Sequence, residues 1–357
     1  MSIMQEFGFV VKDGKRMFVA TVVDDSVVAY SDDTLYEEFK NYLRSRVPIS
    51  ESPLDTICGM RVVRNADGST SIDQQEYIEK KAKAFNCEVQ GTPFKSPMAS
   101  DFKLGVRPEV PDKELVSYAR ELMGSLIYAT LTRHECKYAC SKLASVAVNP
   151  TRSDISAMER ILKYLYASRY TKLTFKKGPW RGPDGYEHGV LEPAVYVDAS
   201  FAQETGRRSQ TGFAVFLAGA AIFAKSGKQT QQTDSTGYSE TIALHEASNW
   251  VILLRNHMSR MFGTRPQFAD KVLSKPTRIY EDNAAAVTFA DKGPGLRSLH
   301  WDVKLQYVHE LQSVRRIIQV VPIDTRLQCA DILTKALDIT QHLQLSTHLL
   351  GGPVIFH

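Results

Sequence analysis

The sequence has few cysteines, little net charge and no long apolar run. Its five cysteines include no CxxC pair, which argues against a disulfide framework and a zinc-ligand spacing. The 44 basic residues exceed the 40 acidic ones by only four, which excludes a histone-like polycation and an acidic tail protein. No stretch approaches the roughly 18 apolar residues that span a bilayer, and the start MSIMQEFGFVV lacks the features of a signal peptide. We therefore expect a soluble, intracellular protein with no membrane partner.

The chain is long enough for two or three domains, and its turn signals divide it. The 357 residues are 43% hydrophobic, which is enough for real cores. Strand-like runs at 7–11 and 17–23 flank a KDGK turn, and a returning strand at 26–30 precedes a helix. A connector with four prolines (91–113) leads to a helical stretch, in which Cys136 and Cys140 are expected to pack in a core. The run KKGPWRGPDGYEHG predicts a linker.

Beyond this linker the pattern predicts a second domain with a mixed sheet. Strands are expected at 194–197, 211–217, 220–225, 277–280 and 316–321. Helices are expected at 239–262, 283–290, 300–314 and 330–337. Three strands followed by alternating helices and strands indicate the mixed α/β class, with helices packed on the sheet.

Four acidic residues fall at the ends of these elements. Asp198 ends the first strand, and Asp282 follows a later one. Glu240 lies in the first turn of the long helix, and Asp331 opens the last one. Strand ends on one edge of a sheet converge, so the four carboxylates could gather, and two Mg²⁺ ions could then neutralise them and clamp a phosphodiester. Alternatively, each acid is a helix cap or an exposed strand end, and spacing alone does not decide.

Sequence motifs provide a further argument. The runs YVDAS, RRSQTGFAVFLAGAAIFAKSGKQ, SETIALHEA, IYEDNAAAVTFA, RSLHWDVKLQYVHE and VPIDTRLQCADILTK occur in this order within about 140 residues. Together they resemble the ribonuclease H domain of Ty1/copia-type retrotransposon polyproteins. The resemblance implies that Asp198, Glu240, Asp282 and Asp331 are the catalytic, metal-binding acids of a ribonuclease H-like mixed sheet, with two Mg²⁺ ions as cofactor.

This part of the chain departs from the family pattern at a few positions. Tyr238 stands where the family has the first glutamate of its SSTEAEY run, and Ala224 replaces a tryptophan. Glu281 replaces a cysteine, and strand alternation predicts that it points away from Asp282, so it is not counted as a ligand. His300 matches a family histidine for which we expect a structural or substrate-side role.

The earlier part of the chain resembles the preceding segment of the same polyproteins. The run VVDDSVVAYSDD is similar to the YVDD motif of the reverse transcriptase palm, with Asp24 and Asp25 as a remnant of the polymerase motif. ELMGSLIYATLTRHECKYACSKLA and PTRSDISAMERILKYL resemble the thumb and connection helices. The aromatic residue before the aspartates is Val22, and the fingers and upstream palm are expected to be missing. We therefore expect no polymerase activity.

These observations predict five segments. They are a truncated palm remnant (1–90), a thumb/connection-like helical region (91–178), a linker (179–190), a ribonuclease H-like domain (191–340) and a C-terminal tail (341–357). A protein partner that covers the truncated palm is a further hypothesis, because a chain that begins inside a domain should fray unless it is held.

Two functions from different classes remain open. One is a Mg²⁺-dependent endonuclease that cleaves RNA in RNA–DNA hybrids, with a hybrid or structured RNA as partner. The other is an exapted, non-catalytic scaffold or nucleic-acid-binding subunit of a larger assembly. A nuclease needs basic side chains that meet phosphates. The candidates are Arg152, Arg160, Lys163, Arg207, Arg208, Lys225 and Lys228.

Overall fold

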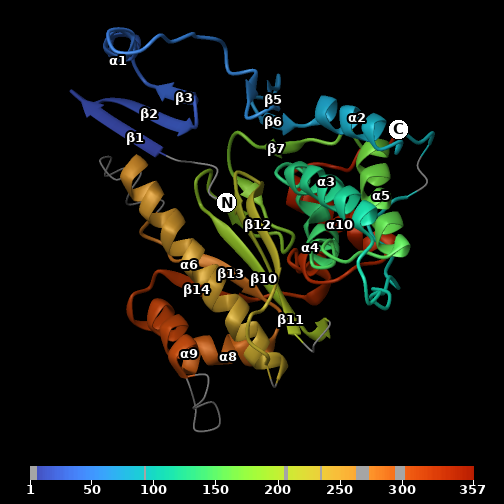
Figure 1. Ribbon diagram of the computed structural model, residues 1–357. Coiled ribbons are helices and arrows are strands. Elements are labelled where there is room, and N and C mark those ends of the chain that lie inside the picture. The colour runs from blue at the N-terminus through green and yellow to red at the C-terminus, as the bar shows by residue number, and fades with distance from the viewer. Residues whose placement is uncertain (1–5, 92–93, 205–207, 234, 263–272, 294–301) are drawn as a thin grey trace.

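The computed structural model describes residues 6–91, 94–204, 208–233, 235–262, 273–293 and 302–357 (Figure 1). Helices and strands are mixed throughout, and the strands form separate sheets. Among the residues described, no helix is both long and apolar enough to cross a membrane. The mixed α/β class expected from the sequence is confirmed.

A five-stranded sheet is the centre of the second half of the chain. Its strand order is β12-β11-β10-β13-β14. The first three strands are antiparallel, whereas β13 and β14 run parallel to β10 and to each other. The bounds are β10 (Ala194–Glu204), β11 (Arg208–Leu217), β12 (Ala220–Lys228), β13 (Thr277–Glu281) and β14 (Ile318–Pro322). This is the mixed sheet with flanking helices that the sequence predicted.

Each face of this sheet is covered by different elements. Side chains alternate along β10, so Val195 and Val197 pack in one core, while Ala194 and Tyr196 pack in another. The helix α6 (Thr236–Phe262) lies along the first face, with α8 (Ala284–Lys292) and α9 (Asp302–His309) beside it (Figure 1). The short turn η5 (Asp331–Leu333) and α10 (Ile339–Leu350) cover the second face. The central strand is therefore buried on both sides.

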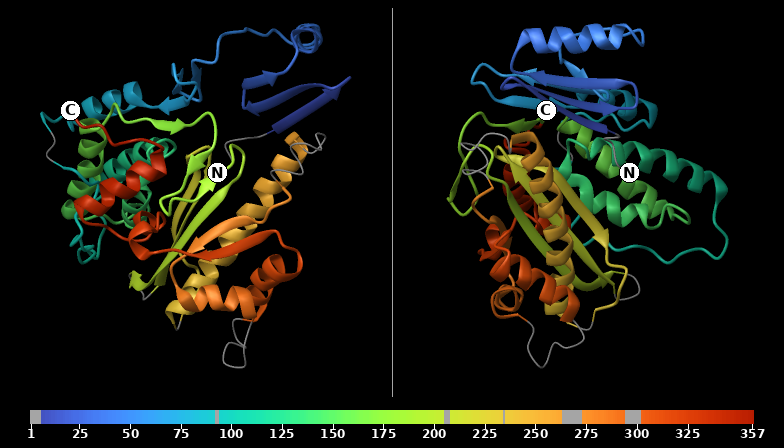
Figure 2. Two further views of the ribbon diagram at one scale, coloured as in Figure 1. Left: turned by 180° about the vertical axis from the view of Figure 1, so that it is seen from behind. Right: turned by 90° about the vertical axis from the view of Figure 1, so that its left-hand side faces the viewer.

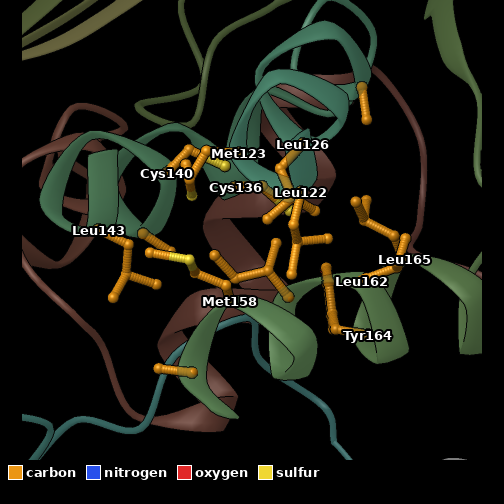
Figure 3. Close-up of a cluster of buried hydrophobic side chains, with 14 of the residues drawn as sticks. Leu122, Met123, Leu126, Cys136, Cys140, Leu143, Met158, Leu162, Tyr164 and Leu165 are labelled. Atoms are coloured by element: carbon orange, nitrogen blue, oxygen red, sulfur yellow. The ribbon is translucent and has the colours of Figure 1, made fainter. Parts of the chain in front are cut away.

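The helical region forms the largest apolar core. It contains α2 (Gln75–Ala84), α3 (Lys113–Ala129), α4 (Lys137–Ala144) and α5 (Arg152–Ala167). Leucines of α3 and α5 meet Met158 and Tyr164 between the helices (Figure 3). Cys136 and Cys140 are buried in the same core, as expected, and burial raises the pKa of Cys140 to about 12. These cysteines are therefore packing residues.

The first hairpin region forms a separate small sheet. It has the order β1 (Glu6–Lys12), β2 (Lys15–Val22), β3 (Asp25–Tyr30), followed by α1 (Asp33–Arg44). Asp32 caps α1 by accepting a hydrogen bond from the Leu35 amide at 3.1 Å. The two views of Figure 2 place this sheet at the far end of α6. Phe18 and Phe262 make the contact there, with ring centroids 6.1 Å apart.

A third sheet joins distant parts of the sequence. Its order is β4 (Thr56–Ile57), β5 (Met60–Arg64), β6 (Thr70–Asp73), β7 (Leu173–Phe175). The segment after α10 returns to this region, where the Ile355 amide donates to the Thr171 hydroxyl at 2.9 Å. The His357 amide donates to the Ala167 carbonyl, also at 2.9 Å. Segments at residues 56–73, 167–175 and 355–357 thus meet in one place.

The segment 179–190, for which the sequence predicts a linker, contains a short hairpin. It pairs β8 (Trp180–Arg181) with β9 (Glu187–His188). Trp180 is buried and stacks on His188, with ring centroids 4.0 Å apart, and it packs in the core of the five-stranded sheet. Its glycines and prolines therefore form a compact turn that covers one end of that core.

Candidate active site

Asp198 lies in the middle of the central strand β10, which continues to Glu204, so the prediction that the strand ends at Asp198 was wrong. The turn η5 and the threonine that follows it hold the side chain. The side chain is 5% exposed, and one carboxylate oxygen accepts a hydrogen bond from the Thr334 hydroxyl. Gly212, opposite Asp198 on β11, allows this approach, because a Cβ there would lie 2.5 Å from the Thr334 methyl carbon. Burial raises the pKa of Asp198, and the charge of Asp282 raises it further.

Asp331 brings the second carboxylate to the same face. It is 1% exposed and lies in η5, a short 3-10 turn, where the sequence predicted the start of a longer helix. Its Oδ1 is 2.8 Å from the Lys335 ammonium, and Gln341 Nε2 donates to Oδ2 at 3.4 Å. Burial raises the pKa of Asp331 to about 7, and the neighbouring charge of Asp198 contributes. The two aspartates therefore belong to one electrostatic site.

Asp282 follows β13 directly and is half-buried beside α8. The next residue, Asn283, caps this helix by accepting hydrogen bonds from the amides of Ala285 and Ala286. Its cap fixes the direction of the backbone at Asp282. The charge of Asp282 raises the pKa values of both Asp198 and Asp331, which places it in the same cluster.

Glu240 reaches the cluster from α6, on the other face of the sheet. The side chain is 3% exposed, and its Oε2 has no hydrogen-bond partner in the described part of the chain. Burial is the main cause that raises the pKa of Glu240 well above its ordinary value, and the charges of Glu281 and Asp198 raise it further. The charges of Asp198 and Asp282 therefore act on both Glu240 and Asp331.

Glu281 is a fifth carboxylate, which was not predicted as a metal ligand from the sequence. Alternation along β13 puts it on the α6 side with Ile279, away from Tyr280, as expected. That side is where Glu240 approaches, and Glu281 is fully buried there. Its Oε1 accepts the Asn283 amide at 3.0 Å, whereas Oε2 has no partner among the described residues. The helix predicted over this face was the signal that could have placed Glu281 beside Glu240.

The donor set of the cluster suits a hard divalent cation. Carboxylate oxygens are the ligands that Mg²⁺ prefers, and Oε2 of both Glu240 and Glu281 has no hydrogen-bond partner among the described residues. Within the described ranges, no three acidic, histidine or cysteine side chains converge as direct ligands of one ion. Instead, the Lys335 ammonium forms an ion pair with Asp331, and the Thr334 hydroxyl donates to Asp198. The residues fit a metal site whose side chains are here held by internal partners.

Three of the basic candidates lie on α5, in the helical region. Arg152 is exposed in the first turn. Arg160 stacks over Phe94, 4.5 Å from the ring centroid, and Lys163 is 3.7 Å from Glu159. The helix α5 packs against α2, α3 and α4. These three side chains therefore belong to the surface of the helical region.

The other basic candidates lie on the five-stranded sheet itself. Arg208 is exposed at the start of β11, and Lys228 donates to Ser145 of the neighbouring helix region at 3.3 Å. Lys225 forms an ion pair with Glu246 of α6 at 2.6 Å. Arg207 and His300 lie outside the described residues. The β11–β12 hairpin thus carries basic side chains on the same sheet as Asp198.

Asp24 and Asp25 lie in a different sheet from the acidic cluster. The turn Val23–Asp24 joins β2 to β3, and Val22 pairs with Asp25 across it. Both aspartates are exposed. In the described residues neither side chain has a hydrogen-bond or ion-pair partner. The pair stands at the tip of the β2–β3 hairpin.

No family model matches the chain, but curated relatives do. A retrovirus-related Pol polyprotein from transposon RE1 of Arabidopsis thaliana is 27% identical over 339 residues, which cover 93% of this chain and 21% of that protein. The corresponding polyprotein from transposon RE2 of the same plant is 26% identical over 92% of this chain and 21% of its own length. The chain therefore spans about a fifth of these polyproteins.

Two further comparisons cover smaller parts of the chain. A putative transposon Ty5-1 protein of Saccharomyces cerevisiae is 25% identical over 59% of this chain and 66% of its own length. LC11-RNase H1, a solved structure of a protein isolated from compost, aligns with 40% of this chain and 92% of its own, with 15% identity and a TM-score of 0.30. Along nearly its whole length, the chain is related to the Pol polyproteins of Ty1/copia-type retrotransposons, which confirms the resemblance carried by its motifs.

Proposed function

We propose that this chain is a retroelement-derived reverse transcriptase/ribonuclease H-like protein that cleaves the RNA strand of RNA–DNA hybrids with Mg²⁺. The catalytic and metal-binding residues are Asp198, Glu240, Asp282 and Asp331. One observation carries the proposal: four carboxylates from four separate elements lie at one sheet, where the charges of Asp198 and Asp282 raise the pKa values of both Glu240 and Asp331. Unfavourable clusters of like charge are typical of functional sites.

Three of the four acids are oriented by neighbours that belong to this chain. The Thr334 hydroxyl holds Asp198, Gln341 holds Asp331, and the Asn283 cap fixes the backbone beside Asp282. When bound, two Mg²⁺ ions would activate the attacking water and stabilise the leaving oxygen of a phosphodiester. The carboxylates would bind these ions, and their burial excludes competing bulk water.

The nucleic acid would lie along the sheet that carries the acids. A hybrid is recognised through its backbone and its 2′-hydroxyl groups, so no base code is required. The exposed Arg208 and the lysines of β12, Lys225 and Lys228, supply positive charge on that sheet. Arg160 and Lys163 lie on α5 of the helical region and not on this sheet, so they are weaker candidates for phosphate contacts.

A cleavage assay tests the proposal. The purified chain is mixed with a hybrid labelled on its RNA strand, with Mg²⁺ or with EDTA, and with single-stranded RNA and duplex DNA as controls. We expect RNA cleavage only in the hybrid and only with Mg²⁺. Asp198→Asn and Asp282→Asn should each lower the rate by several orders of magnitude, because the metal ions share these ligands.

A matched control separates loss of the site from loss of any carboxylate. Asp324 pairs with Arg326 at 2.8 Å on the surface of the same half of the chain, so Asp324→Asn should cleave like the wild type. Near-wild-type cleavage by Asp198→Asn would refute the assignment. If the wild type binds hybrid without cleaving it, the non-catalytic scaffold replaces the enzyme.

A further inference from the structure

The acidic cluster already contains one positive group, the ammonium of Lys335. It lies 2.8 Å from Asp331 Oδ1, and the charges of Asp198 and Asp282 also act on it. We propose that Lys335 is an internal counter-cation that occupies the acidic cluster in the metal-free protein and exchanges with a divalent cation. The inference rests on the proposed function, because it concerns the same carboxylates. It adds a residue outside the predicted ligand set.

Burial explains why the cluster needs a cation of its own. Asp198 and Asp331 are 5% and 1% exposed, so water screens their mutual repulsion poorly. Like-charged carboxylates in one buried site are stable only when a proton or a cation neutralises them. The Lys335 ammonium, 2.8 Å from Asp331 Oδ1, supplies such a cation in the metal-free protein.

The geometry of Lys335 allows it to leave. Its side chain is 36% exposed, in contrast to the buried Asp331 that it contacts. The two residues are four positions apart, and the Lys335 amide donates to the Asp331 carbonyl at 3.1 Å, so the flexible stem begins within the same turn. A lysine ammonium has three rotating N–H donors and lacks the rigid bidentate geometry of an arginine guanidinium, so it can exchange one partner for another.

A purely structural ion pair would behave differently from an exchangeable one. If Lys335 only braced η5, its removal would lower stability and leave the affinity of the carboxylates for Mg²⁺ unchanged or reduced. If it occupies the cation's place, its removal frees Asp331 Oδ1 and abolishes the repulsion of an incoming dication. The sign of the change in Mg²⁺ affinity therefore distinguishes the two roles.

The experiment measures Mg²⁺ binding by titration calorimetry, and Mn²⁺ binding by electron paramagnetic resonance, at about pH 8, which is above the pKa of about 7 of Asp331. Removing one unit charge at this separation should tighten Mg²⁺ binding by Lys335→Met about tenfold or more. Lys335→Arg keeps the charge and should bind like the wild type. In EDTA, Lys335→Met should melt at a lower temperature, and Mg²⁺ should raise its melting temperature more than that of the wild type.

Two controls make the result specific. Lys40 also forms ion pairs with two carboxylates, those of Glu37 and Glu51. It lies on α1, which follows the separate three-stranded sheet, so Lys40→Met should leave Mg²⁺ binding unchanged. Asp198→Asn should abolish binding if the proposed site is correct. If Lys335→Met does not fold, Lys335→Gln provides the same comparison with a polar side chain.

The outcomes separate this inference from the proposed function. If the wild type binds Mg²⁺, Asp198→Asn does not, and Lys335→Met binds no more tightly, the inference is overturned and the metal site stands. Binding by Lys335→Met alone would support the inference and refute Mg²⁺-dependent activity of the wild type. If neither protein binds, both proposals are overturned.

Discussion

The buried ion pair of Arg133 and Glu135 should be the most sensitive point of the helical region. Arg133 is 1% exposed, and its guanidinium contacts Glu135 Oε1 at 2.7 Å. It also donates to the carbonyl and the hydroxyl of Ser168 at 3.0 and 2.7 Å. We expect Arg133→Met, which keeps a long side chain but removes the charge, to destabilise the protein strongly.

The magnitude follows from what the substitution leaves behind. The Glu135 carboxylate is 1% exposed, and its other close partner is the Tyr164 hydroxyl at 3.3 Å. An uncompensated buried charge of this kind costs about 3–5 kcal/mol. Replacing both charged residues with methionine removes the unpaired carboxylate too. Such double replacements are close to neutral in many proteins, so we expect the double variant to lose about 2 kcal/mol or less.

Urea unfolding followed by circular dichroism measures both losses. The control is Arg181→Met, since Arg181 pairs with Glu187 at 2.8 Å on the surface, and loss of that pair should cost about 1 kcal/mol or less. The reasoning is refuted if Arg133→Met costs no more than Arg181→Met. It is also refuted if the double variant loses as much as the two single variants added together, because the charges would then not be coupled.

Four further predictions concern the site and its surroundings. Because the pKa of Asp331 is raised to about 7, the folded state binds this proton more tightly than the unfolded state does. The stability of the metal-free protein should therefore fall as the pH rises from about 4 to 7. Melting curves in EDTA should show this fall, and Asp331→Asn should reduce it. Gly212→Val should cost about 1–3 kcal/mol in urea unfolding, because a Cβ there would lie 2.9 Å from the Leu333 Cβ. Hybrid binding in filter assays should weaken steeply with salt, and Arg208→Gln should reduce the logarithmic slope by about one; an unchanged slope removes Arg208 from the interface. Primer extension assays should detect no nucleotide incorporation, since Asp24 and Asp25 are exposed at a hairpin tip with Val22 beside them, and template-dependent incorporation would contradict this.

The strands that carry the acids could be predicted because their pattern is local. The apolar run before Asp198 and the run before Asp282 are buried on both faces of the sheet. Strands buried on both faces are rich in apolar residues, so the composition of these runs alone predicts central strands. The long helix was also predicted, with Glu240 in its first turns; it begins at Thr236 instead of Ser239. In these elements local propensity and tertiary packing favour the same structure.

Other features depend on contacts that no local pattern encodes. The last predicted helix, 330–337, is only the turn η5, because Leu333 and Thr334 pack into the space that Gly212 leaves open. The pairing of Lys335 with the acids follows from that turn. Glu281 was placed on the correct face, but its neighbour Glu240 comes from a helix that is about 40 residues earlier in the sequence. Side chains brought together in this way are visible only once the layers are assembled.

The meeting of distant segments in the helical region has a consequence for how the chain folds. Tyr164 contacts His342 at 3.4 Å across 178 positions, and Thr171 contacts Ile355 across 184. Closing loops of that length before any contact forms is entropically slow, and such topologies fold late and expose apolar surface meanwhile. During synthesis, α3 and α5 must therefore wait for residues 339–357 before their core is complete. A nascent chain that stalls before α10 would present that open core to chaperones.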